Sequence, residues 1–159
     1  MEIIWSWIGS FLGIAAVGLI HLQVLDRFGL TMIIGSFGAS AVLIYGAPRS
    51  PLAQPRNLIG GHVLSAVIGV AVFQFFGNQL WLAAALAVSL SIAAMHLTKT
   101  LHPPGGATAL IAVIGGQSVH ELGYFYVLMP TALGAAVMLL VALIVNNIPA
   151  GRRYPEFWR

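Results

Sequence analysis

The sequence predicts an all-helical integral membrane protein made of about six hydrophobic segments. The first observation is composition: 59% of the 159 residues are hydrophobic and 7% are charged, whereas a soluble domain carries about 25% charged residues. The second is a set of four long apolar runs, and the third is a pair of shorter apolar runs that contain glycine. Too few charges remain to cover a water-exposed surface, so we expect one transmembrane domain over residues 1–159.

The four long runs cover residues 3–25, 58–76, 80–97 and 122–145. About 20 helical residues cross about 30 Å of hydrocarbon, and each run approaches or exceeds that length. We therefore predict four full membrane-spanning helices.

The two short runs cover residues 30–46 and 103–116. As ideal helices they would cover only roughly 21 to 25 Å, which is less than the hydrocarbon thickness. Each must therefore be partly extended, thin the bilayer locally, or enter and return on the same side.

The positions of Lys and Arg favour crossing over re-entry. If all six segments cross, Arg27 lies on one side with Asp26 and Glu121, and six cations share the other side: Arg49, Arg56, Lys99, Arg152, Arg153 and Arg159. If the short segments re-enter, the cations divide four against three. The positive-inside rule favours the first arrangement, with both termini in the cytoplasm. In the tail we expect Tyr154, Phe157 and Trp158 to lie in the membrane interface.

An internal repeat supports the same topology. Gly38-Ala39-Ser40-Ala41 aligns with Gly106-Ala107-Thr108-Ala109, and each copy lies in a short segment between two long ones. Three crossings per half would make the halves, residues 1–77 and 78–150, an inverted pair, as in many secondary transporters. The alternative is that both copies are ordinary small-residue packing motifs. Small-residue motifs of this kind pack helices within one chain or between chains, so the sequence leaves open whether the protein forms homo-oligomers.

The matching short segments predict a binding site for a small anion. Proline is favoured in the first turn of a helix, so the second short segment should begin directly after His102. Helix N-termini present free N–H groups and partial positive charge, and hydroxyls add donors. Two helix starts would face one anion, and the predicted substrate-binding residues are Ser36, Gly38, Ser40, His102, Pro103, Pro104, Gly105, Gly106 and Thr108.

Histidine provides the titratable groups within the predicted membrane segments. Because imidazole changes charge near neutral pH, His62 and His102 are candidates for a proton-linked role. His21 and His120 are better interpreted as helix-end or headgroup contacts. The five histidines do not group at metal-ligand spacing, so we expect neither a metal site nor another cofactor. Lys and Arg are absent from the middle of every predicted span, which argues against a carrier built on a buried cation.

Other functional classes have less support. The acids, Glu2, Asp26, Glu121 and Glu156, lie near segment ends, so the sequence does not predict an enzyme. We expect the lipid bilayer and a small inorganic anion as partners, and no nucleic acid. The alternative is a structural or sensory membrane subunit without a transported substrate.

Several motifs resemble the HPP family of small integral membrane proteins. The runs are HPPGGATAL, preceded by APRSPLAQPRNLIGGH and followed by NN and RRYP near the end. The resemblance implies a bacterial inner-membrane or plastid-envelope protein, and cyanobacterial and plant members are associated with nitrite transport. Family accounts usually describe four spanning helices, which differs from the six segments predicted here. Nitrite fits the predicted site, although the same groups would hold chloride, nitrate or formate almost as well.

Overall fold

The computed structural model describes residues 2–25 and 32–158, and these residues are mostly helical and include no strand. Four helices are long and apolar enough to span a membrane, as predicted from the sequence. They are α1 (Glu2–Ile20, continued by η1, His21–Leu25), α3 (Pro55–Phe76), α4 (Leu80–Thr98), and α7 (Leu133–Val145) with η5 (Val127–Ala132) before it. Asp26, Arg27 and Arg159, used above for topology, lie outside the described residues.

The two short segments are also helices, which confirms the prediction of four long and two short elements. The first is α2 (Gly35–Ala41), which continues as η3 (Val42–Gly46), and the second is α5 (Pro103–Ile114). α5 begins at the first proline of the His-Pro-Pro motif, because proline needs no amide partner in the first turn. The minor elements are η4 (Pro51–Ala53) and α6 (Gln117–His120).

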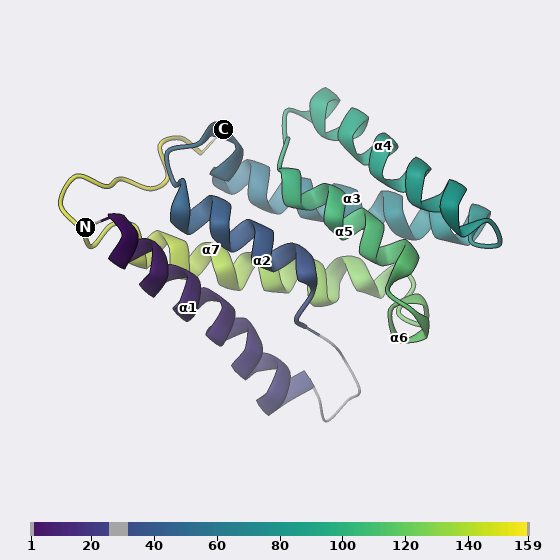
Figure 1. Cartoon of the computed structure of the whole chain (residues 1–159), viewed down its shortest axis with the longest axis horizontal. Coiled ribbons are helices and arrows are strands. Elements are labelled where there is room, and N and C mark those ends of the chain that lie inside the picture. The colour runs from purple at the N-terminus through teal and green to yellow at the C-terminus, as the bar shows by residue number, and fades with distance from the viewer. Residues whose placement is uncertain (1, 26–31, 159) are drawn as a thin grey trace.

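All six segments run from one end of the molecule to the other, in alternating directions (Figure 1). At one end, hydrogen bonds join the tail to the start of α1 and to η4, and the start of α3 to the end of α4: Arg152 with Glu2, Tyr154 with Ala53, and Arg56 with Thr98. We call this the basic end, since it holds Arg49, Arg56, Lys99, Arg152 and Arg153. At the opposite, far end, the Phe73 and His120 rings stack 3.6 Å apart.

These directions place Glu2 and the C-terminal tail at the same end. The alternation is the arrangement that two inverted three-segment halves require, and the short segments traverse the molecule instead of turning back. The repeat between residues 1–77 and 78–150 itself stays a prediction, as does the assignment of the basic end to the cytoplasm.

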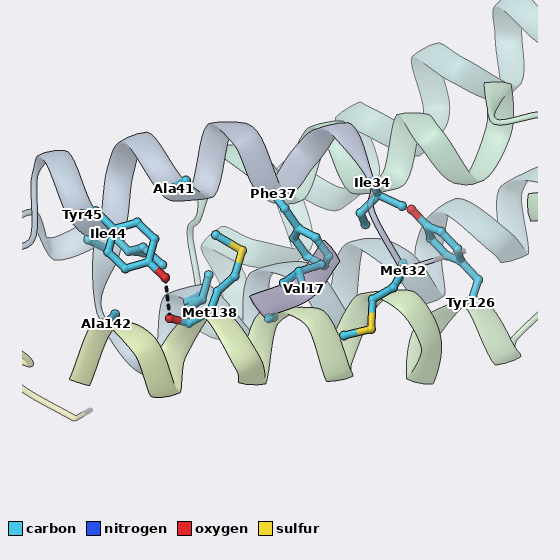
Figure 2. Packing of buried hydrophobic residues seen from close by; sticks show 14 of the residues in the cluster. Val17, Met32, Ile34, Phe37, Ala41, Ile44, Tyr45, Tyr126, Met138 and Ala142 are labelled. Carbon is cyan, nitrogen blue, oxygen red and sulfur yellow. Dashed lines mark hydrogen bonds between the residues drawn. The ribbon is translucent and has the colours of Figure 1, made fainter. Parts of the chain in front are cut away.

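The first three segments pack around α7. The Tyr45 ring lies against Gly9 and Gly13 of α1, where an added Cβ would come within 2.7 Å of a ring carbon at either position, and the Tyr45 hydroxyl donates to the Met138 carbonyl at 2.9 Å. Figure 2 shows this bond and the row of side chains, including Phe37, that α2 and η3 place over α7. Small residues thus let an aromatic side chain fill the space between helices.

On the other side of the molecule, α5 packs closely on α3 and α4 (Figure 1). A Cβ on Gly61 would lie 2.5 Å from the Cβ of His102, and one on Gly105 would lie 2.8 Å from the Gly61 carbonyl oxygen. A Cβ on Gly69 would lie 2.7 Å from the Ala109 carbonyl oxygen. The glycines therefore permit backbone contact between α3 and α5, as small residues do in membrane helix pairs.

The last predicted span, residues 122–145, is not one continuous helix. Met129 has extended backbone angles, φ −132° and ψ 126°, directly before Pro130. The proline ring disfavours the helical conformation at the preceding residue, and this local rule explains the break. The apolar run alone did not reveal it.

The tail packs into the basic end more deeply than the sequence indicated. Tyr154 is buried and donates to the Ala53 carbonyl at 2.8 Å, so it is not an interfacial anchor. Burial raises the pKa of its phenol. Arg152 is also buried and bonds to Glu2 and Ser6, whereas Phe157 and Trp158 are exposed. The tail thereby closes the basic end over α1 and η4.

Candidate functional site

Five hydrogen-bonding side chains meet where the two short helices cross the interior. Each is fully buried, at 0% exposure. We call them the polar cluster: Ser36 and Ser40 from α2, His62 from α3, His102 at the start of α5, and Thr108 within α5. A polar group buried in an apolar membrane protein is costly unless it is hydrogen-bonded, so this cluster is the strongest candidate for a functional site.

Ser40 lies between the two imidazole rings. Its Oγ is 2.7 Å from His62 Nε2 and 2.9 Å from His102 Nε2. The ring centroids are 5.0 Å apart and tilted by 60°. One hydroxyl therefore joins histidines from two different helices.

Thr108 connects His62 to the other hydroxyl of α2. Its Oγ1 lies 2.7 Å from His62 Nδ1, 2.9 Å from Ser36 Oγ and 3.3 Å from the Pro104 carbonyl oxygen. Its own carbonyl accepts a bond from the buried Tyr126 hydroxyl at 3.1 Å. α5 is thus held at its middle by groups from three other segments.

His102 is fixed by the chain around it. Its Nδ1 lies 2.8 Å from the Leu52 carbonyl oxygen of η4, and its backbone is extended, with φ −138° and ψ 104°, directly before α5. The neighbouring Leu101 carbonyl accepts from Asn57 of α3 at 2.8 Å. This non-helical stretch is covered by protein, as irregular backbone within a membrane protein must be.

The remaining predicted site residues lie around the polar cluster and face elsewhere. Pro104 is buried and contributes its carbonyl, whereas Pro103 is exposed. The Gly105 amide donates to the His102 carbonyl at 2.8 Å, and its Cα faces α3. Gly106 faces Val88 of α4, at 3.8 Å from an added Cβ, and Gly38 faces open space.

The two helix starts do not meet at one point. α2 and α5 are antiparallel, so Gly35 at the start of α2 lies beside Ile111, 3.9 Å from an added Cβ. The start of α5 lies instead near Ser40, in the second turn of α2. The groups that converge are therefore hydroxyls and imidazoles, because antiparallel packing puts each N-terminus beside the later part of its partner.

His62 belongs to the polar cluster although sequence reasoning did not include it in the substrate site. The sequence predicts a proton-linked role for His62 and His102, but no spacing pattern along the chain indicates that the two rings meet through Ser40. The Gly61 beside it is the one local indication, since a glycine marks a close approach of another backbone.

A pocket of about 330 Å³ opens at the far end of the molecule. Its lining includes Gln74, Asn78, His120 and Ala112. Ala112 lies four residues after Thr108, so both are on one face of α5, a single turn apart. Among the residues that the structure describes, no group of three or more His, Cys, Asp or Glu side chains is placed to hold a metal ion.

Comparison with known sequences decides the family. The model of the HPP transmembrane region matches residues 1–155. The chain belongs to the HPP transmembrane family. Two transmembrane proteins of Dictyostelium discoideum are 52% and 49% identical to this HPP chain over 99% of its length, which is 51% and 56% of theirs. The chain thus spans about half the length of these relatives, and no solved structure matches it.

Proposed function

We propose that the protein transports a small monovalent anion across the membrane, with the polar cluster forming part of the pathway. Nitrite is the substrate that the family resemblance implies. The observation that carries the proposal is the burial of five hydrogen-bonding side chains at the contact of two short, antiparallel helices. Polar groups at membrane depth are expensive and often mark a solute pathway.

The chemistry of the polar cluster suits a weakly held anion. Hydroxyl and imidazole N–H groups donate hydrogen bonds, and none of these five side chains carries a permanent positive charge. Donors without a fixed charge replace water around an anion and still release it, which transport requires. The two hydroxyls of α2 and the one of α5 would contribute from opposite helices.

Access to the polar cluster differs between the two ends. Toward the far end, the pocket reaches Ala112, one turn from Thr108. Toward the basic end, His102 is bonded to Leu52, its neighbour Leu101 is bonded to Asn57, and the tail is bonded to Ala53, next to Leu52. The proposal therefore includes a second conformation in which the basic end opens, as alternating access requires.

The direct test is uptake by proteoliposomes of the purified protein, offered nitrite, nitrate, chloride and formate in turn. We expect uptake of nitrite above that of protein-free vesicles, and its loss in Ser40→Ala. The matched control is Ser89→Ala, a serine on the exposed surface of α4. If folded, inserted protein moves none of the four anions, the proposal is wrong.

A structural or sensory subunit is the second candidate, and one observation favours it. Every side chain of the polar cluster already has a hydrogen-bond partner within the protein. A purely structural cluster would stabilise the fold without binding any solute. In that case Ser40→Ala would lower the stability of the fold, and neither the unchanged protein nor the variant would transport an anion.

Location in a membrane follows from the family and the apolar helices. We further propose that the basic end faces the cytoplasm, because five described Lys and Arg residues gather there. The resemblance implies the bacterial inner membrane, whereas the relatives reported above come from Dictyostelium discoideum. Cysteine labelling from each side, at Ser50→Cys in the basic end and Gln117→Cys in the far end, tests the orientation.

A further inference from the structure

The hydrogen bonds of the polar cluster admit few proton arrangements. A carbonyl oxygen only accepts, so His102 Nδ1 must carry a proton and donate to Leu52. In a neutral ring the other nitrogen then only accepts, and His102 Nε2 must take its bond from the Ser40 hydroxyl. The Ser40 proton is thereby used.

The rest of the neutral arrangement follows from this first assignment. Because Ser40 has no second proton, His62 Nε2 must donate to it, which leaves His62 Nδ1 as an acceptor. Thr108 then donates its one proton to His62 Nδ1, so in the neutral arrangement it cannot donate to Ser36 Oγ or to the Pro104 carbonyl. The bonds of this neutral arrangement all point the same way, from Thr108 to Leu52.

One additional proton fits without breaking any of these contacts. If His62 gains a proton on Nδ1, it donates to Thr108, and the Thr108 hydroxyl turns to Ser36 or to the Pro104 carbonyl. Passing the charge onward moves the His62 Nε2 proton to Ser40 and the Ser40 proton to His102 Nε2. The added proton binds at His62 Nδ1, beside Thr108. The resulting single positive charge then lies on His62 or, after the transfer, on His102.

A second additional proton does not fit. With both rings charged, both Nε2 atoms would donate to Ser40 Oγ, and the Ser40 proton would lose its acceptor. Two like charges would also lie on rings whose centroids are 5.0 Å apart in a poorly screened interior. The geometry therefore limits the cluster to one extra proton.

Uncharged side chains lie against the two rings in the described part of the chain. From α2, Phe37 meets His62 edge-on at 5.4 Å, and from α4, Met95 lies beside Gly61. Tyr126 is bound to the Thr108 carbonyl, and Arg56, on the same helix as His62, is bound to the Thr98 carbonyl. His96 of the neighbouring α4 and Lys99 directly after that helix are exposed. Within the described part of the chain, no carboxylate, Lys or Arg hydrogen-bonds to either ring.

We infer that the polar cluster is a binding site for a single proton, shared by His62 and His102 through Ser40, and that the proton travels with the anion. The second part of this inference, that the proton travels with the anion, rests on the proposed function. The charged cluster supplies the positive charge that the neutral one lacks, and one proton balances one monovalent anion. Transport is then electroneutral.

The proton site is tested without transport by nitrogen NMR of histidine-labelled protein. At alkaline pH we expect the Nδ1–H form of His102 and the Nε2–H form of His62, assigned with His102→Gln and His62→Gln. On acidification the two rings together should gain one proton. His96→Gln, at an exposed position on α4, is the control. The opposite ring forms, no proton uptake by folded protein, or two protons taken up would each overturn the inference.

Coupling is tested in proteoliposomes by recording nitrite uptake, luminal pH and the response to an imposed K⁺ diffusion potential. Protein-free vesicles correct for nitrous acid that crosses lipid unaided. We expect one proton per nitrite and no response of uptake to potential. Uptake of nitrite without protons would overturn the inference and leave the proposed function intact. One-proton binding by NMR with no anion uptake would support the proton site and overturn the proposed function.

Discussion

The two short helices, α2 and α5, carry a similar four-residue pattern, and they differ in the residue directly before it. Ser40 and Thr108 occupy the matching place in the pattern, and both point into the polar cluster. Gly38 and Gly106 also match, and neither faces the cluster. The shared pattern therefore corresponds to a shared orientation, with a hydroxyl inward and a glycine two residues earlier facing away.

The residue one position before each pattern makes the difference. In α2 it is Phe37, whose ring fills the space over Gly134 of α7 so closely that an added Cβ on Gly134 would overlap the ring. In α5 it is Gly105, which brings the helix into backbone contact with Gly61. The lesson is that the repeat places the polar side chains, whereas this one residue sets how closely each helix approaches its neighbour.

The largest expected effect is that of Phe37→Ala. The substitution leaves a cavity over Gly134 and removes the edge contact with His62, at a cost of about 3 kcal/mol. We expect a clearly lower thermal unfolding midpoint in detergent. Phe75→Ala, at a side chain 82% exposed on α3, should change the midpoint little. Equal effects of the two substitutions would contradict the packing comparison.

Gly105→Ala should have the next largest effect. Its methyl group would lie 2.8 Å from the Gly61 carbonyl oxygen and 2.9 Å from Ser65 Oγ, and such overpacking costs about 2 kcal/mol. The adjacent Gly106→Ala is the matched control, because its methyl meets Val88 at an ordinary 3.8 Å. The same unfolding measurement separates them. Similar stability of both variants would show that α3 and α5 do not approach as closely as described.

The two matching hydroxyls should differ in their contribution. Ser40→Ala leaves two ring nitrogens without their partner, at a cost of about 1.5 kcal/mol, whereas Thr108→Val leaves one ring nitrogen and the Ser36 hydroxyl without theirs. We expect a lower unfolding midpoint in Ser40→Ala than in Thr108→Val. Thr108→Ser keeps the hydroxyl, so its unfolding midpoint should be close to that of the unchanged protein. A larger loss in Thr108→Val would reverse the assigned roles.

The smallest effect is expected for Gly38→Ala. The position faces open space within a helix, so alanine should raise stability by about 0.5 kcal/mol or leave it unchanged. Nitrite uptake should also be unchanged, since Gly38 does not face the polar cluster. Loss of uptake in a stable Gly38→Ala protein would restore the helix-start site predicted from the sequence.

Much of the architecture could be read from the sequence because bilayer thickness imposes it. The four long runs had to become spans, and Pro103 had to begin a helix, since both follow from local length and backbone chemistry. The break at Met129 was also readable from Pro130, although the apolar run concealed it. The structure brings Ser36, Ser40 and Thr108 together, and their role as a substrate site stays a prediction.

The tertiary structure decided which groups converge with them. Antiparallel packing of α2 on α5 separated the two helix starts and joined Ser36 to Thr108, residues 72 positions apart. Close approach of α3 and α5 brought His62 to His102 through Ser40. Sequence by itself determined the membrane class, the spans and the helix start, because these depend on local hydrophobicity and backbone chemistry. The contact of His62 and His102 through Ser40 depends on the distance and register between helices, which only side-chain packing sets.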